Sequence, residues 1–180
     1  MEHGVRPGVT FFFCCCNGLV QLSKNNIVLP NPDELPRDIW RKKGILYPYF
    51  KDALGAADCT HILAKVSSDN IPRFRNRKGE ISQNVLAMCT FGLFFACVIP
   101  GWEGSVHDGR VLQWALQNGL EVPEGKYVLV DAGYALRKGF LAPYRGVCYH
   151  LREQAISKLR FVYIFYIIFI FIFNITYISC

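Results

Sequence analysis

The sequence lacks the cysteine spacing of a zinc-binding module. None of its eight cysteines forms a CxxC pair, which excludes the zinc-finger class of DNA-binding proteins. Most of them are instead expected to be small buried apolar residues in a reducing compartment. A secretory signal is not expected either, because the apolar run at residues 11–16 is too short and no basic segment precedes it.

An excess of one charge is present, but it is small. The chain has 20 Lys and Arg residues against 14 Asp and Glu, a formal net charge of +6. Such an excess suits a polyanionic partner without requiring one. The length of 180 residues allows one domain with a sizeable core.

An aspartate stands in the middle of the small and apolar stretch at residues 54–62. Aspartate is disfavoured in strands and is rarely buried without a partner. Asp58 is therefore expected to bind a metal ion or to join a buried hydrogen-bond network, at or near the end of a strand at 53–57. The alternative is a turn aspartate between two short strands.

A second aspartate follows a second apolar strand. Residues 126–130 are typical of a buried strand, and Asp131 comes at its carboxyl end, where the ligands of open α/β sheets collect. The alternative is a turn aspartate before Gly133. Asp58 also follows an apolar strand segment, and two aspartates in this position are harder to explain by coincidence than one.

The apolar residues 85–99 predict a hairpin between these two strands. Gly92 lies near the middle, which favours two strands and a tight turn over one buried helix. Pro100 and Gly101 are expected to end the second strand.

A helix is predicted after Asp108, because the apolar residues that follow lie on one helical face and Gly119 supplies a stop. Asp108 is either the N-cap of this helix or a catalytic residue. His61 and His107 are expected to make structural hydrogen bonds rather than to bind a metal.

The polar segment 65–79 carries a basic cluster of Arg73, Arg75, Arg77 and Lys78. Lysine and arginine contact phosphates without reading base sequence, so one interpretation is a loop that holds a DNA backbone. The alternative is a solvated basic loop.

Several short motifs occur in order along the chain, from Asp58 through the basic loop to the segment after Asp131. They are Leu54–Ile62, Arg75–Asn84, Pro100–Asp108, Leu129–Tyr134 and Leu141–Gly146. This series resembles the PIF/Harbinger branch of the DDE transposases and the host proteins derived from them, over about residues 35–153.

The resemblance implies an α/β fold, namely an RNase H-like mixed sheet with flanking helices. It also implies that Asp58 and Asp131 share divalent metal, Mg²⁺ or Mn²⁺, for phosphodiester chemistry on DNA. The expected domain is a partial DDE endonuclease domain at 35–153, located in the nucleus and open to a nuclear protein partner.

The sequence departs from the family pattern in two places. Cys59 stands where the family has glycine, and its side chain is expected to strain the backbone beside the metals. The third acid of the family is a downstream glutamate on a helix; Glu153 comes too early, and no acidic residue follows it. The chain as written is therefore expected not to cleave DNA, which leaves a nonenzymatic DNA- or protein-binding remnant as the alternative.

Both ends of the chain are unusual. Residues 1–34 form an atypical leader or linker whose run at 11–16 has neither helical nor strand periodicity. Residues 154–180 form a hydrophobic tail in which 161–180 are uncharged and long enough for an apolar transmembrane helix, with the domain on the cytoplasmic side. On this interpretation the protein is a tail-anchored membrane protein. The alternative is that the tail is translated from AT-rich noncoding sequence.

Overall fold

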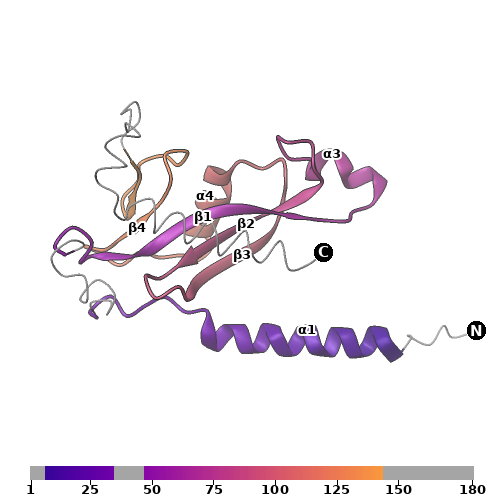
Figure 1. Cartoon of the computed structure of the whole chain (residues 1–180), viewed down its shortest axis with the longest axis horizontal. Helices are drawn as coiled ribbons and strands as arrows, with labels where there is room; N and C mark the ends of the chain where they lie inside the picture. Colours follow the sequence, from indigo (N-terminus) through magenta and orange to yellow (C-terminus); the bar gives the residue numbers. More distant parts are fainter. Residues whose placement is uncertain (1–6, 35–46, 144–180) are drawn as a thin grey trace, which may run out of the picture.

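A five-stranded mixed sheet forms the centre of the protein (Figure 1). We describe it from a computed structural model that covers residues 7–34 and 47–143. The strand order is β3-β2-β1-β4-β5, and the strands are β1 (Ala53–Leu63), β2 (Ser82–Cys89), β3 (Phe95–Glu103), β4 (Tyr127–Leu129) and β5 (Phe140–Leu141). Strands β1, β2 and β3 are antiparallel, whereas β4 is parallel to β1 and β5 is parallel to β4.

This arrangement confirms a mixed α/β fold and is consistent with the RNase H-like sheet that the sequence implied. The expected apolar C-terminal helix and Glu153 lie outside the described residues. The domain limits at residues 34, 35 and 153 stay a prediction.

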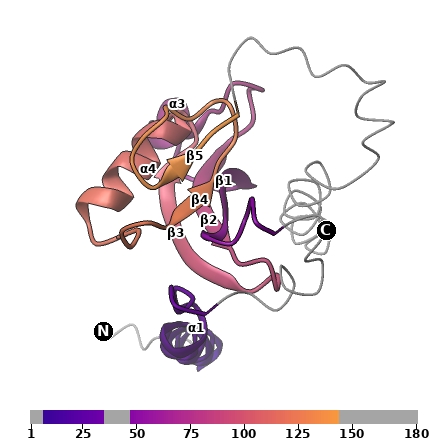
Figure 2. The same ribbon diagram turned by 90° about the vertical axis from the view of Figure 1, so that its left-hand side faces the viewer.

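Helix α4 (Asp108–Gln117) connects β3 to β4 and packs on one face of the sheet (Figure 2). Its apolar stripe buries Val111, Leu112 and Ala115. The main core forms where this stripe meets the inward side chains of the strands, among them Leu54, Ala57, Leu86, Met88 and Val128. A smaller cluster covers the other face and includes Phe50, Ala53, Ala56, Ala87, Cys89 and Leu129.

The predicted hairpin is confirmed, but its second strand is longer than expected. β3 continues past Pro100 and Gly101 to Glu103. The pairing explains why: Asn84 faces Trp102 and Leu86 faces Ile99, so two residues of β3 oppose one residue of β2 in a bulge. A proline is tolerated there because β3 is the edge strand among the described residues, so no ladder hydrogen bond within this part of the chain requires its N–H.

The strand that carries Asp58 is also longer than expected. β1 runs for 11 residues, and Asp58 lies in its middle instead of at its end. The reason is that β2 pairs with β1 as far as Leu63, whereas the parallel ladder with β4 stops at Ala56 and Leu129. Gly55 permits the close approach of the first two strands, since a Cβ there would collide with the carbonyl oxygen of Cys89.

The leader contains a regular helix, which the sequence analysis did not predict. Helix α1 (Pro7–Asn26) lies beside the sheet in both views (Figures 1 and 2). Its aromatic side chains are open to solvent, with exposed fractions of 72% for Phe11, 62% for Phe12 and 60% for Phe13. Because the helix buries no single face, its sequence carries no amphipathic period from which it could be predicted.

No helix within residues 7–34 and 47–143 is long and apolar enough to cross a membrane. The predicted transmembrane segment at 161–180 lies outside these ranges.

Candidate active site

Asp58 lies in β1, and Asp131 follows the end of the neighbouring parallel strand β4. The last parallel pair joins Ala56 of β1 to Leu129 of β4, and each aspartate follows two residues later on its own chain segment. Both aspartates therefore lie where β4 ends and β1 continues, on that side, without a neighbouring strand from residues 7–34 or 47–143. This is the carboxyl end of the parallel ladder, where open α/β sheets place their ligands.

The carboxylate of Asp58 replaces the missing backbone partner of β1. Its Oδ1 accepts a hydrogen bond from the N–H of Cys59 at 2.8 Å and one from the Tyr134 hydroxyl at 3.4 Å. The N–H of Cys59 lies beyond the last pair with β4, and the Asp58 side chain accepts its hydrogen bond instead. This contact explains why an aspartate is tolerated inside the strand. Asp58 is half-buried, and it accepts both of these hydrogen bonds on one carboxylate oxygen.

Asp131 closes the turn that follows β4. Its Oδ1 accepts a hydrogen bond from the N–H of Gly133 at 2.8 Å, as expected of a turn aspartate. The other oxygen makes no hydrogen bond with any residue of 7–34 or 47–143, and the side chain is exposed. Asp131 can therefore keep its turn contact and still offer an oxygen to a ligand.

Three negative charges meet around Asp58. The pKa of the Asp58 carboxyl is raised from 3.8 to about 6, chiefly by burial and secondarily by the charges of Asp131 and Asp108, against the lowering effect of its hydrogen bonds to Cys59 and Tyr134. The negative charges of Asp131 and Asp108 that raise the pKa of Asp58 also favour the binding of a cation, which would neutralise them.

Asp108 begins α4 as predicted, but it is not the N-cap. His107 caps the helix, because its Nδ1 accepts a hydrogen bond from the N–H of Gly109 at 3.1 Å. Asp108 is left free to turn inward, and its Oδ1 accepts a hydrogen bond from Asn84 Nδ2 at 2.8 Å. The other histidine, His61, bonds Ser82 Oγ at 3.0 Å, so both histidines make the structural hydrogen bonds expected of them.

Asn84 holds the carboxylate of Asp108 in place from β2. Its side chain is fully buried, and Nδ2 also donates to the carbonyl oxygen of Val106 at 3.0 Å. Its own Oδ1 has no hydrogen-bond partner among the described residues. A buried amide that gives both bonds to one loop fixes the start of α4 against the sheet.

Cys59 does not strain the backbone, contrary to the expectation. It lies in regular antiparallel pairing with Leu86, and of the described residues other than glycine only Leu93 has a positive φ. The thiol packs against the main core and contacts Tyr134 and Asp108. Burial raises the pKa of the Cys59 thiol, so the thiol is neutral in this structure.

The donor set at this end of the sheet suits a hard divalent cation. Mg²⁺ binds proteins through one or two carboxylates and keeps several waters, and Asp58 and Asp131 offer that pair. Within the described part of the chain, no three acidic, histidine or cysteine side chains converge on one point. The charge of Asp108 therefore acts on Asp58, but Asp108 does not form a three-ligand cluster with Asp58 and Asp131.

The sequence analysis did not assign roles to Tyr134 and Asn84, which orient the acids. Both belong to the short motifs quoted above, but neither residue type indicates a ligand by itself. The available signal was their polarity within apolar surroundings, since a buried hydroxyl or amide needs a hydrogen-bond partner.

The basic loop is a folded turn. Asn76 is buried, and its Oδ1 accepts hydrogen bonds from the N–H groups of Lys78 and Glu80 at 2.9 and 3.0 Å. Arg75 donates to the carbonyl oxygen of Gly79 at 3.1 Å, and Arg73 forms an ion pair with Glu103. The four basic residues Arg73, Arg75, Arg77 and Lys78 are all exposed.

Comparison with known proteins gives the family of the chain. A family model described as DDE superfamily endonuclease matches residues 57–161, and the chain belongs to this family. The resemblance seen in the motifs is thereby confirmed.

The relatives of this chain include HARBI1, a protein named as a candidate nuclease. Identity is 33% over 93 residues for the Mus musculus protein, with 50% of this chain and 27% of that protein covered. It is 32% for Rattus norvegicus and 31% for Homo sapiens, with the same coverage. The chain thus spans about a quarter of the length of the curated relatives it matches. No solved structure matches the chain.

Proposed function

We propose that this chain is the metal- and DNA-binding core of a transposase-derived endonuclease, with Asp58 and Asp131 as its metal ligands. The observation that carries the proposal is the position of the two acids, each two residues beyond the last parallel pair of β1 and β4. DDE superfamily endonucleases generally use divalent metal ions, and the carboxylate pair suits Mg²⁺ or Mn²⁺.

Each polar residue around the pair has a distinct task in this proposal. Asp58 and Asp131 hold the ion, Tyr134 orients the Asp58 carboxylate, and Asn84 keeps Asp108 close to the site as a further negative charge. The bound ion would activate the attacking oxygen and stabilise the leaving oxygen at a phosphodiester. The natural location of such a protein is the nucleus; a tail-anchored membrane location is the alternative that residues 161–180 raise.

The test of the metal site is thermal unfolding of the full chain with Mn²⁺. A ligand that binds only the folded state at ten times its dissociation constant stabilises by about 1.4 kcal/mol, so the melting temperature should rise by several degrees. Asp131→Asn should abolish that rise, because it removes one of two anionic ligands. Asp69→Asn, a change at an exposed aspartate of the η1 turn (Ser68–Asn70), is the matched control and should keep it. A full response in Asp131→Asn would contradict the assignment.

A second candidate function is DNA binding without catalysis. It is supported by the exposed basic turn together with the lack of a three-ligand cluster in the described ranges. In that case the protein would be a domesticated remnant that binds DNA, or a nuclear protein partner, through its surface.

DNA binding by the basic turn is tested by changing Arg73, Arg75 and Arg77 together to Ala. We expect weaker binding to every sequence and a flatter dependence on salt, by about 0.9 in log–log slope per phosphate contact removed. The measurement is fluorescence anisotropy with duplex DNA over a salt series. An unchanged slope would show that the turn is merely solvated.

A further inference from the structure

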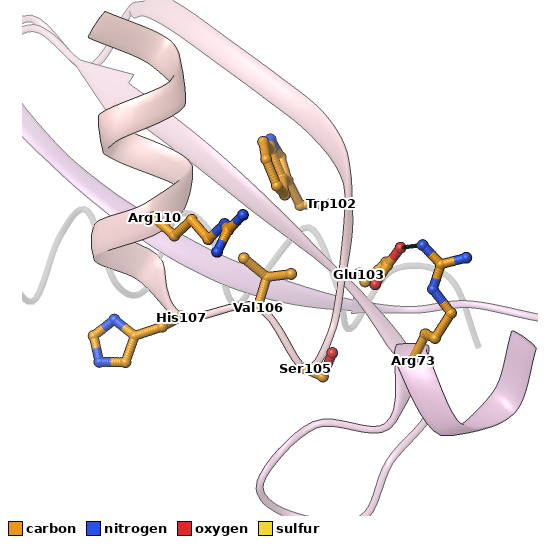
Figure 3. A pocket seen from close by; sticks show the side chains of 7 residues that line it. All are labelled: Arg73, Trp102, Glu103, Ser105, Val106, His107 and Arg110. Carbon is orange, nitrogen blue, oxygen red and sulfur yellow. Dashed lines mark ion pairs between the residues drawn. The ribbon is translucent and has the colours of Figure 1, made fainter. Parts of the chain in front are cut away.

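A hollow of about 470 Å³ lies at the start of α4, between this helix and the end of β3 (Figure 3). Arg73 of helix α3 (Ile71–Phe74) lines one side, and Arg110 of α4 lines the other. Figure 3 shows Arg110 extending toward Trp102, while Arg73 and Glu103 face each other across the hollow from it. One side of the hollow therefore carries the Arg110 guanidinium, and the other carries the Arg73 guanidinium paired with the Glu103 carboxylate.

The walls of this hollow are held together by backbone contacts. The N–H of Ser105 donates to the carbonyl oxygen of Arg73 at 3.1 Å, which ties the loop before α4 to α3. Gly104 allows the loop to approach, since a Cβ there would collide with the carbonyl oxygens of Phe74 and Ser82. The two arginines are thus carried by segments with a fixed separation.

We infer that this hollow binds a backbone phosphate of DNA, and that the Glu103 carboxylate holds the position of the phosphate until DNA displaces it. This inference rests on the proposed function, which makes DNA the ligand. A guanidinium binds carboxylate and phosphate oxygens through the same planar fork of donors, so one anion can replace the other.

The exposure of the ion pair favours exchange. The side chain of Arg73 is 64% exposed and that of Glu103 is 28% exposed, and ion pairs at a protein surface contribute little to stability. Arg110 is exposed and has no side-chain partner within the described ranges, so it is ready to meet the same phosphate. Arg110 is also two residues from Asp108 in the first turn of α4.

The decisive variant is Glu103→Gln in the full chain, with binding to duplex DNA measured in EDTA. Freeing Arg73 adds about one phosphate contact, so affinity should rise roughly five- to tenfold at 0.1 M salt and the log–log salt slope should steepen by about 0.9. Arg73→Gln added to Glu103→Gln should remove the whole gain. Arg110→Gln in the unmodified chain should weaken binding by a similar factor.

The matched control is Glu124→Gln, which also removes a carboxylate from an ion pair at the surface, here with Lys138. It should change affinity less than twofold, because charges beyond a Debye length of about 10 Å are screened at this salt. Equal effects of Glu103→Gln and Glu124→Gln would overturn the inference. The inference would also be overturned if inorganic phosphate competed more strongly with DNA for Glu103→Gln while the affinity of this variant for DNA did not rise. DNA binding is measured in EDTA, so its result does not depend on whether Asp58 and Asp131 bind a metal. The metal site and the phosphate site can therefore be disproved independently of each other.

Discussion

Replacing Asp58 with Asn should stabilise the metal-free protein by about 2 to 3 kcal/mol at neutral pH. The carboxyl takes up its proton at about pH 6 in the folded protein, against 3.8 for the ordinary group, chiefly because it is buried and secondarily because Asp131 and Asp108 repel its charge. At about 1.4 kcal/mol per pH unit, that difference corresponds to roughly 3 kcal/mol, which partial exposure reduces. Asn keeps an oxygen that can accept the hydrogen bond of the Cys59 N–H and carries no charge.

The pH dependence has a definite sign. Between pH 3.8 and about 6 the folded state binds more protons at this site than the unfolded state does. The contribution of Asp58 to stability is therefore complete below pH 3.8 and is lost as the pH rises through 6. The advantage of Asp58→Asn should be near zero at pH 4 and largest at pH 7. Urea unfolding in EDTA at several pH values measures it.

Asp69→Asn serves again as the control and should show no such pH-dependent gain. Saturating Mn²⁺ should stabilise the unmodified chain and leave Asp58→Asn unchanged, so that the difference narrows. Equal stability of the two proteins at pH 7 without metal would contradict the cost of burying the Asp58 charge, to which burial contributes most and the neighbouring acids less.

The 180-residue chain should not cleave duplex DNA above the level of an Asp58→Ala control. Catalysis of this kind depends on metal ions held in fixed positions, and no acidic residue follows Glu153 in this 180-residue sequence to match the downstream glutamate that the family resemblance implies. Loss of a positioning group costs several kcal/mol of barrier, at about 1.4 kcal/mol per tenfold in rate. The assay is cleavage of duplex DNA with Harbinger-like ends in Mg²⁺ or Mn²⁺.

Cutting that requires metal and vanishes in Asp58→Ala would contradict this expectation. It would mean that Asp108 or Glu153 completes the site. Asp108→Asn would then separate the two, because Asn84 already holds Asp108 by a hydrogen bond near Asp58.

The sequence predicted the features that arise from apolar patterning. The hairpin around Gly92 and the helix after Asp108 were predicted because their apolar periods reflect burial against a single core. The two aspartates were predicted because a charged residue in an apolar strand requires an explanation.

The features that escaped prediction depend on contacts between distant segments. The full length of β1 depends on β2, which continues to pair after β4 has ended. His107 replaces Asp108 as the cap because Asn84, from another strand, draws the aspartate inward. Helix α1 escaped because it packs no single face, so burial left no periodic pattern in its sequence.

The bulge at Pro100 also bears on how one molecule meets another. β3 is the long outer strand of the sheet, and such a strand can recruit a strand from a neighbouring molecule through its free N–H and C=O groups. Pro100 removes one donor from that row, and the extra residue at Gly101 twists the row away from straight pairing. The other outer strand, β5, offers only two residues. Both outer strands therefore disfavour pairing with a strand of another molecule. This lowers the tendency of these apolar strands to aggregate.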